Sequence, residues 1–204
     1  PSAAAAYAGM SLTHRELSSS VAYLTATESP DKDSSSHDWS KLATATQTLV
    51  IFMGVRKLAG LMQLLIDNGR APDCPAAVIQ SASTPAQRTI VGTVADIADK
   101  ATAAGIGMPA LTIVGEVVRL RETLRWFDTK PLFGKRVLVT RAVEQSESLA
   151  QALREHGAAT LELPMIRIEP ALDPAPLTAA VAALRSYQWL VFTSQNGVRA
   201  FFSE

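Results

Sequence analysis

Short apolar runs separated by segments of helical period dominate the first half of the chain. Residues 48–53 are rich in β-branched side chains and precede Gly54, which is typical of a buried strand. The next segment predicts a helix that ends near Gly69, because its apolar residues recur at helical spacing: Leu58, Leu61, Met62 and Leu65. Further strands are expected over residues 77–79, 88–92 and 111–115. This alternation of strands and helices predicts an α/β domain.

Two local patterns add detail to this domain. Thr93 and Asp96 stand three residues apart, as in a capping box with Asp in place of Glu. The helix that they open has an apolar face of Val94, Ile97, Ala98 and Ala101. Residues 31–40 are polar and serine-rich, so we expect a surface loop there.

The pattern starts again after residues 128–135, which we predict to be a linker between two domains. Strands are expected over 136–140, 160–168 (interrupted by Pro164) and 189–193. One helix should end near Gly157, with three residues facing inward: Leu149, Ala152 and Leu153. A second is marked by Leu177, Val181 and Leu184. This β-α-β-α-β order predicts a doubly wound unit over residues 136–204.

Composition narrows the possible partners. The 204 residues include 19 basic and 19 acidic side chains, which argues against a broad nucleic-acid surface. Cys74 is the single cysteine, so no intramolecular disulfide can form and a cytoplasmic location is expected. The three histidines lie far apart, and we expect no metal site. No apolar run reaches the roughly 20 residues of a membrane span.

Several short sequence motifs in the first half resemble those of a known family. Residues 7–15, YAGMSLTHR, resemble the YAGIPLTHR segment of uroporphyrinogen-III C-methyltransferases. Further segments resemble that family in the same order: 48–54 (TLVIFMG), 84–88 (TPAQR), 109–118 (PALTIVGEVV) and 126–127 (WF). The resemblance covers residues 1–127 and implies the C-terminal lobe of a tetrapyrrole methylase, a class III methyltransferase. The family's glycine-rich first loop and GGDP segment have no counterpart here, so we expect this domain to be incomplete.

The second half resembles another family of the same pathway. Residues 134–142 (GKRVLVTRA), 163–168 (LPMIRI) and 189–198 (WLVFTSQNGV) are similar to segments of uroporphyrinogen-III synthases. The resemblance implies a partial flavodoxin-like unit over residues 136–204, which lacks its C-terminal part. The two enzymes are known to occur fused on one chain. We therefore expect a fragment of a bifunctional enzyme of tetrapyrrole biosynthesis, inactive in isolation.

The resemblance also implies the chemistry. The first family transfers methyl groups from S-adenosylmethionine to two pyrrole carbons of uroporphyrinogen III, and the product precorrin-2 leads to sirohaem and cobalamin. The second closes hydroxymethylbilane to uroporphyrinogen III, inverting the last pyrrole and losing water. We expect S-adenosylmethionine as the methyl donor, no metal, a small tetrapyrrole substrate, and a homodimer formed through the methylase domain. No residue is assigned as catalytic, and the choice between sirohaem and cobalamin stays open.

The family's cofactor site implies four residues of this chain. Met53 matches a methionine that packs on the cofactor, where a soft thioether suits an adenosyl group. Ala82 matches a small residue that presents its backbone to the cofactor, although the sequence Ser81-Ala82-Ser83 departs from the commoner NGT motif. Pro109 and Ala110 match the adenine pocket, and a purely structural role at the start of a strand is equally open.

Candidate substrate residues come from both halves. Thr13, His14 and Arg15 match the family's THR, after an expected strand. An arginine fork there suits the carboxylates of uroporphyrinogen, and an orienting hydrogen bond is favoured over proton transfer for His14. In the synthase-like half, Thr193, Ser194 and Asn196 resemble a substrate loop at a strand end, with plain helix capping as an even alternative.

Two other functions compete with this interpretation. A related precorrin or diphthine methyltransferase would share the fold but not the substrate. Alternatively, residues 134–204 could form a non-catalytic, flavodoxin-like binding or receiver module. A receiver needs acidic residues after its first strand, whereas this chain has Thr140-Arg141-Ala142, which disfavours that alternative.

Overall fold

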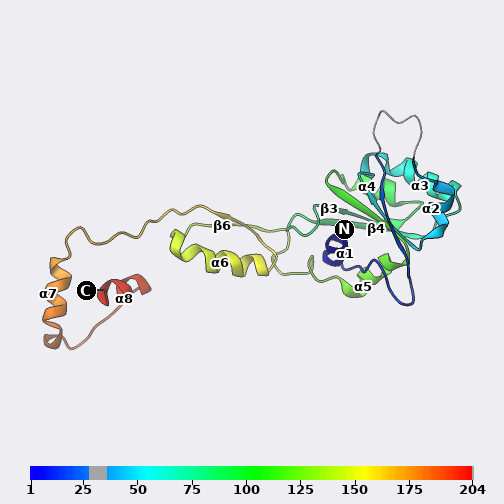
Figure 1. Ribbon diagram of the computed structural model, residues 1–204. Coiled ribbons are helices and arrows are strands. Elements are labelled where there is room, and N and C mark those ends of the chain that lie inside the picture. Colours follow the sequence, from blue (N-terminus) through cyan, green and yellow to red (C-terminus); the bar gives the residue numbers. More distant parts are fainter. Residues whose placement is uncertain (28–35, 204) are drawn as a thin grey trace.

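The computed structural model describes residues 1–27 and 36–203. A five-stranded sheet packed between helices forms the first part, and residues 136–203 extend away from it (Figure 1). The strands follow the order β1 (Val21–Thr25), β2 (Thr48–Phe52), β5 (Ala110–Val114), β3 (Pro75–Gln80) and β4 (Arg88–Thr93). The mixed α/β character expected of the first half is confirmed. β1 was not predicted, because its sequence VAYLT is only five residues long and follows a run of three serines.

Strand direction decides which loops meet. β1 runs parallel to β2, whereas β5 runs antiparallel to both β2 and β3, and β4 is antiparallel to β3. The C-terminal ends of β2 and β3 therefore lie beside the N-terminal end of β5, at one end of the strands. The register is consistent with this, since Phe52 and Ile79 both pair with Leu111, from opposite sides. The loop after Phe52, the turn after Gln80 and the segment before Ala110 are thus brought together.

One face of the sheet is covered by α2 (Trp39–Ala45), α3 (Leu58–Asp67) and α4 (Ile97–Ala103) (Figure 1). The apolar helix residues predicted from spacing are in this core, and Leu65 and Ile97 are completely buried. A 3-10 turn, η1 (Val55–Lys57), precedes α3, and Gly69 ends it with a φ of 94°. At α4, the Asp96 carboxylate accepts a hydrogen bond from the Thr93 amide at 2.7 Å, which is one half of the expected capping box.

The opposite face is covered by α1 (Ser2–Tyr7) and η2 (Glu116–Leu120), and the following α5 (Arg121–Leu124) has no buried residue. Because the sequence of α1 is mostly alanine, it favours a helix and lets the helix pack closely on the sheet. The expectation of a strand before Arg15 is wrong: α1 and an irregular loop precede that residue, and the next strand begins at Val21.

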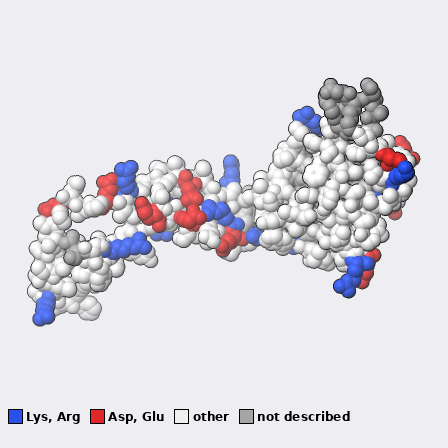
Figure 2. Space-filling model, in the orientation of Figure 1, with Lys and Arg blue, Asp and Glu red and all other residues white. Residues whose placement is uncertain are grey.

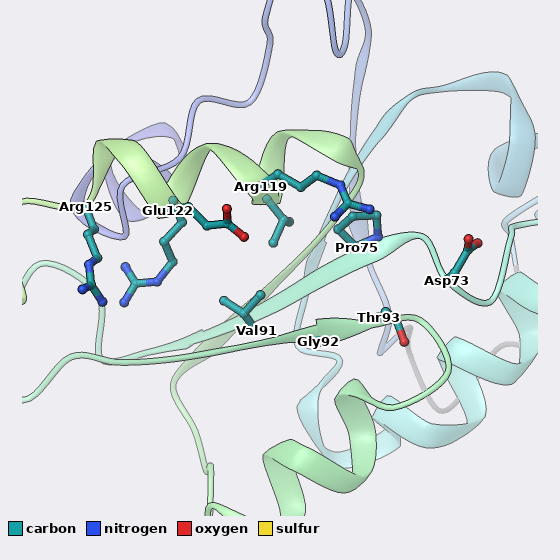
Figure 3. A pocket seen from close by; sticks show the side chains of 10 residues that line it. Asp73, Pro75, Val91, Gly92, Thr93, Arg119, Glu122 and Arg125 are labelled. Atoms are coloured by element: carbon teal, nitrogen blue, oxygen red, sulfur yellow. The ribbon is translucent and has the colours of Figure 1, made fainter.

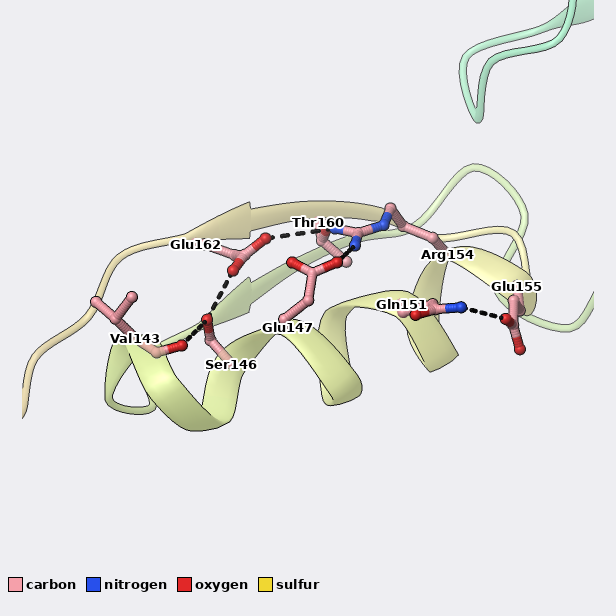
Figure 4. A network of polar contacts seen from close by, with 8 residues as sticks. All are labelled: Val143, Ser146, Glu147, Gln151, Arg154, Glu155, Thr160 and Glu162. Atoms are coloured by element: carbon pink, nitrogen blue, oxygen red, sulfur yellow. Dashed lines mark hydrogen bonds and ion pairs between the residues drawn. The ribbon is translucent and has the colours of Figure 1, made fainter.

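The second part is smaller than predicted. β6 (Arg136–Val139) and β7 (Ala159–Glu162) form a parallel pair, joined by the crossover helix α6 (Val143–Glu155). Polar contacts hold α6 against β7 (Figure 4). The Ser146 hydroxyl donates to Glu162 at 2.8 Å, and Arg154 forms ion pairs with Glu162 at 3.3 Å and Glu147 at 2.7 Å.

Beyond β7 the predicted doubly wound unit is not formed. Residues 189–193 are irregular rather than a strand, and the side chains of Trp189 and Val191 are 85% and 77% exposed. A strand needs a neighbour to satisfy its backbone groups, and here the sheet stops at two strands. The helices α7 (Ala175–Ala182) and α8 (Gln195–Phe201), with the short η3 (Leu184–Ser186), lie beyond it (Figure 1).

The inward face predicted for α6 is also corrected. Ser146 and Ala150 are buried, whereas Leu149 and Ala152 are exposed. The two-stranded sheet packs against the face of α6 that carries Ser146 and Ala150, and no further strand covers the face that carries Leu149. Residues 31–35 of the predicted serine-rich loop lie outside the described residues. The rest of that loop ends earlier than expected, because Asp38 caps α2 by accepting a hydrogen bond from the Lys41 amide.

The molecular surface is consistent with the neutral composition. On the face drawn in Figure 2, most of the sheet unit lacks charged side chains, and positive and negative groups alternate along the second part. No broad basic surface is visible on that face. Over the described residues, no helix combines the length and the apolarity needed to cross a membrane.

Candidate active site

A cavity of about 480 Å³ lies at the sheet edge where β2 and β3 end and β5 begins; we call it the edge cavity. Its floor is apolar, with Phe52, Ile79 and Leu111 contributed by three adjacent strands. Its rim is formed by loops and by the start of α1: Pro1, Ala4, Ser81, Ala82, Thr84, Ala86, Pro109 and Ala110. Three of the four predicted cofactor residues, Ala82, Pro109 and Ala110, are therefore brought together from positions far apart in the sequence.

The backbone around this edge is unusual. Among the described residues, three that are not glycine have positive φ angles: Met53 at 51°, Ser81 at 50° and Ser83 at 63°. Such conformations are uncommon outside glycine and are found often at binding and catalytic sites. All three belong to the loops after β2 and β3. This signal was not available from the sequence, where two serines and a methionine give no hint of a left-handed backbone.

The turn that carries Ala82 is fixed from several sides. The Ser81 amide donates to the Pro109 carbonyl at 3.0 Å, and the Thr84 hydroxyl donates to the Ser81 carbonyl at 2.7 Å. The Ser83 amide donates to the side-chain oxygen of Gln87 at 2.9 Å. Because its backbone groups are held in this way, the turn presents a rigid rim of peptide groups beside an apolar floor, as ligand pockets commonly do.

Met53 is near this cavity without lining it. It follows Phe52 directly, its side chain is 59% exposed, and its carbonyl accepts a hydrogen bond from the Thr27 hydroxyl at 2.8 Å. Its assignment to the cofactor stays a prediction.

A second cavity of about 520 Å³, the loop cavity, lies on the other side of α1. The loop after α1 lines it from Gly9 to Thr13, together with Tyr23 of β1 and Leu124 of α5. α1 separates the two cavities, since Pro1 and Ala4 face the edge cavity whereas Ser2 and Ala6 face the loop cavity.

The predicted substrate residues of the first half differ in their surroundings. Thr13 lines the loop cavity, whereas His14 and Arg15 do not. The His14 ring accepts a hydrogen bond at Nδ1 from the Glu16 amide at 3.3 Å, and its backbone pairs with Ser18. The side chain of Arg15 is exposed. His14 is thus held in its loop, and Arg15 extends from that loop.

The predicted synthase residues lie in a different part of the molecule. Ser194 caps α8, accepting a hydrogen bond from the Gly197 amide at 3.1 Å, which is the alternative left open by the sequence. The Asn196 side chain accepts from Gln145 of α6 at 2.8 Å and lines a cavity of about 570 Å³. Thr193 is exposed. Because residues 189–193 are not a strand, these three residues do not stand at a strand end as expected.

A further cavity of about 470 Å³ lies near the opposite end of the sheet, where several arginines gather (Figure 3). Two of these arginines have structural partners. Arg119 pairs with Glu116 at 2.7 Å, and Arg121 pairs with Asp128 and donates to the Ala8 carbonyl. None of the cofactor-binding or substrate-binding residues predicted from the sequence lines this cavity.

Possible metal ligands and the single thiol bear on other kinds of chemistry in the described part of the chain. Within it, no group of three or more His, Cys, Asp or Glu side chains could hold a metal ion. Burial raises the pKa of the Cys74 thiol, which disfavours the reactive thiolate.

Two family models match successive parts of the chain. Residues 1–98 match the family model of tetrapyrrole (corrin/porphyrin) methylases, and residues 147–204 match that of uroporphyrinogen-III synthase HemD. The porphyrin biosynthesis protein HemD of Ruminiclostridium josui is 38% identical over 98% of this chain and 40% of its own length. This chain therefore spans less than half of that relative.

Two other proteins are similar to the first part. An S-adenosyl-L-methionine-dependent uroporphyrinogen III methyltransferase of Methanosarcina barkeri is 44% identical over 58% of this chain and 47% of its own length. The crystal structure of cobalt precorrin-4 methyltransferase CbiF, a cobalamin biosynthetic enzyme, aligns with a TM-score of 0.51 at 28% identity, over 57% of this chain and 48% of that one. The chain thus joins a segment similar to tetrapyrrole methylases to a segment similar to uroporphyrinogen-III synthases. Most residues of the edge cavity lie in the first segment, and Pro109, Ala110 and Leu111 follow it.

Proposed function

We propose that this chain is part of a bifunctional enzyme of tetrapyrrole biosynthesis. Its first part contributes to the methylation of uroporphyrinogen III to precorrin-2 by S-adenosylmethionine, and its second part to the cyclisation of hydroxymethylbilane. The observation that carries the proposal is the edge cavity, where Ala82, Pro109 and Ala110 converge. The likeness of two successive segments to two enzymes of one pathway supports it.

The edge cavity fits the proposed cofactor. Its volume of about 480 Å³ is in the usual range for small-molecule sites, and its apolar floor suits an adenine ring. The Ala82 amide and the Ser83 carbonyl, which the internal hydrogen bonds of the turn do not use, can meet the polar parts of the ligand. When bound, S-adenosylmethionine supplies an electrophilic methyl group.

The residues of the chain act mainly by binding and orientation. A pyrrole carbon is already nucleophilic, so alignment with the methyl group in a site shielded from water supplies much of the rate. The loop that carries Thr13, His14 and Arg15 lies across α1 from the edge cavity. There Arg15 can bind a carboxylate of the substrate, since its side chain is exposed and the loop behind it is hydrogen-bonded.

The direct test uses the full-length protein that contains this chain. Incubation with uroporphyrinogen III and S-adenosylmethionine should give the dimethylated chromophore of precorrin-2, and hydroxymethylbilane should give uroporphyrinogen III. Methyl transfer to a later precorrin, with none to uroporphyrinogen III, would show that the alternative of a related methyltransferase is correct. The similarity to cobalt precorrin-4 methyltransferase is the reason to test that alternative.

The proposal has two further parts. The 204-residue chain alone should catalyse neither reaction, because it spans 40% of the length of its Ruminiclostridium josui relative. Tight, stoichiometric binding of S-adenosylmethionine to this chain in calorimetry would contradict that. Homodimerisation through the methylase part, which the family resemblance implies, is tested by sedimentation of the full-length protein.

A further inference from the structure

Side chains from distant parts of the sequence cap the end of α1. Three successive carbonyls there each accept a side-chain hydrogen bond: Ala6 from the Trp126 indole at 3.0 Å, Tyr7 from the Gln87 amide at 3.1 Å, and Ala8 from the Arg121 guanidinium at 2.6 Å. The last carbonyls of a helix lack partners within the helix. The three donor side chains, which we call the α1 clamp, therefore fix the point where the chain leaves α1.

Gln87 differs from the other two members of the clamp. It is only 3% exposed, and both ends of its side-chain amide are used. The nitrogen donates to the Tyr7 carbonyl, and the oxygen accepts from the Ser83 amide at 2.9 Å. Ser83 adjoins Ala82 of the edge cavity and has a positive φ. One buried side chain thus joins the rim of the edge cavity to the end of α1.

α1 and the loop after it line the loop cavity. Gly9 to Thr13 follow the clamped carbonyls directly, and all of them border that cavity. The link through Gln87 therefore runs from one cavity to the other, through a helix that separates them. A glutamine suits this place because it offers a donor and an acceptor on one short, neutral group.

We propose that Gln87 is a positioning residue of the methyl-transfer site, which holds the Ala82 turn and the Gly9–Thr13 loop in a common geometry. It acts through the peptide groups of Ser83 and Tyr7, not by touching a ligand. The inference rests on the proposed function for the identity of the ligands, whereas the mechanical link between the two cavities stands on the contacts alone.

Amide hydrogen exchange on the 204-residue chain tests the link without any ligand. Gln87→Met keeps the size of the side chain but removes both hydrogen bonds. We expect about a tenfold loss of protection at the Ser83 amide and at the amides that close α1, namely Ala8, Gly9 and Met10. Gln87→Glu, at a pH where the carboxyl is ionised, keeps the acceptor for Ser83 and loses the donor to Tyr7. It should deprotect the end of α1 alone.

Thr84→Val is the matched control. It removes the hydrogen bond from the Thr84 hydroxyl to the Ser81 carbonyl, in the same turn, but does not reach α1. It should deprotect the turn and leave the end of α1 unchanged. Unchanged protection of Ala8 to Met10 in Gln87→Met, or equal deprotection there in Thr84→Val, would overturn the link.

Kinetics of the full-length protein then test its consequence. Gln87→Met should raise the KM for both S-adenosylmethionine and uroporphyrinogen III, about tenfold each, whereas Thr84→Val should raise only that for S-adenosylmethionine. A rise confined to one substrate in Gln87→Met would refute the positioning role. If the unaltered full-length protein does not methylate uroporphyrinogen III, the proposed function fails, and hydrogen exchange still decides the link.

Discussion

Arg15 differs from most other arginines of the sheet unit in what its side chain contacts. Arg70 donates to the Thr46 carbonyl, Arg88 to the Ala104 carbonyl and Arg121 to the Ala8 carbonyl. These three stabilise the fold. The exposed guanidinium of Arg15, by contrast, has no hydrogen-bonding partner among the described residues, and it lies on a loop held by the pairing of His14 with Ser18.

Arg15→Ala should therefore weaken substrate binding without destabilising the protein. A charge-assisted contact to a carboxylate is worth roughly 1.5–3 kcal/mol, or about a ten- to hundredfold change in affinity. Titration of the full-length protein with a uroporphyrin measures this, with Arg119→Ala as a control at the far end of the sheet. A loss of S-adenosylmethionine affinity instead would assign Arg15 to the other ligand.

At the scale of elements, prediction succeeded where the pattern was long and locally consistent. The helix over Leu58–Asp67 and the strands β2 to β5 follow from spacing and β-branched runs. α1 and β1 were missed because neither has a period of its own: α1 is nearly all alanine, and β1 is partly exposed. The prediction of a strand over residues 189–193 was wrong for the opposite reason: the segment has the composition of a strand, but no strand lies beside it.

The candidate site, too, could be predicted from the sequence only in part. Ala82, Pro109 and Ala110 were assigned through a family resemblance, and the register of β2, β5 and β3 explains why they meet. Gln87 lies in the 84–88 segment that resembles the family, but its contacts could not be found from the sequence, because its two partners lie 4 and 80 residues away.

Gly9, in the loop after α1, and Gly60, inside α3, should respond in opposite ways to substitution by alanine. At Gly9 the φ is 73°, and an added Cβ would lie 2.5 Å from the Cα of Arg125, so Gly9→Ala should lower the free energy of unfolding by at least about 2 kcal/mol. At Gly60, within α3, no atom lies within 4 Å of such a Cβ. Gly60→Ala should raise stability by roughly 0.5–1 kcal/mol. Urea unfolding compares them, and equal effects would contradict the close contact at Gly9.

The start of α4 should give the stability of the sheet unit a dependence on acid pH. Hydrogen bonds from Lys100 and from the Thr93 amide lower the pKa of Asp96. Because the folded pKa is below the unfolded one, this carboxylate stabilises the fold above the unfolded pKa, near 3.9, and the contribution is lost as pH falls through the folded pKa. Asp96→Ala should thus lower Tm at pH 6 and have little effect near pH 2. A difference in Tm that is the same at both pH values would show that the charge is not responsible.

At the scale of the molecule, the two parts differ in how well they bury apolar side chains. The sheet unit has two buried cores, whereas large side chains beyond β7 are exposed, among them Leu172, Trp189 and Phe202. Contiguous exposed apolar surface favours association.

The 204-residue chain should accordingly self-associate as its concentration rises. Light scattering should show an increasing mean mass, and the double substitution Trp189→Ser with Val191→Ser should reduce that increase. Val91→Thr, which alters an exposed apolar residue on β4 of the sheet unit, is the control and should have no effect. Association that persists unchanged in the double variant would locate the contact elsewhere.

The segment predicted as a linker is attached to both parts. On one side Asp128 pairs with Arg121, and Phe127 packs against Tyr7 with ring centroids 4.7 Å apart. On the other side the Leu132 amide donates to the His156 carbonyl, and a Cβ added at Gly157 would lie 2.9 Å from the Lys130 side chain. For protein engineering, a cut at 128–135 would therefore deprive each half of packing that it uses. Separate expression of the two parts would do better with overlapping pieces that each retain this segment.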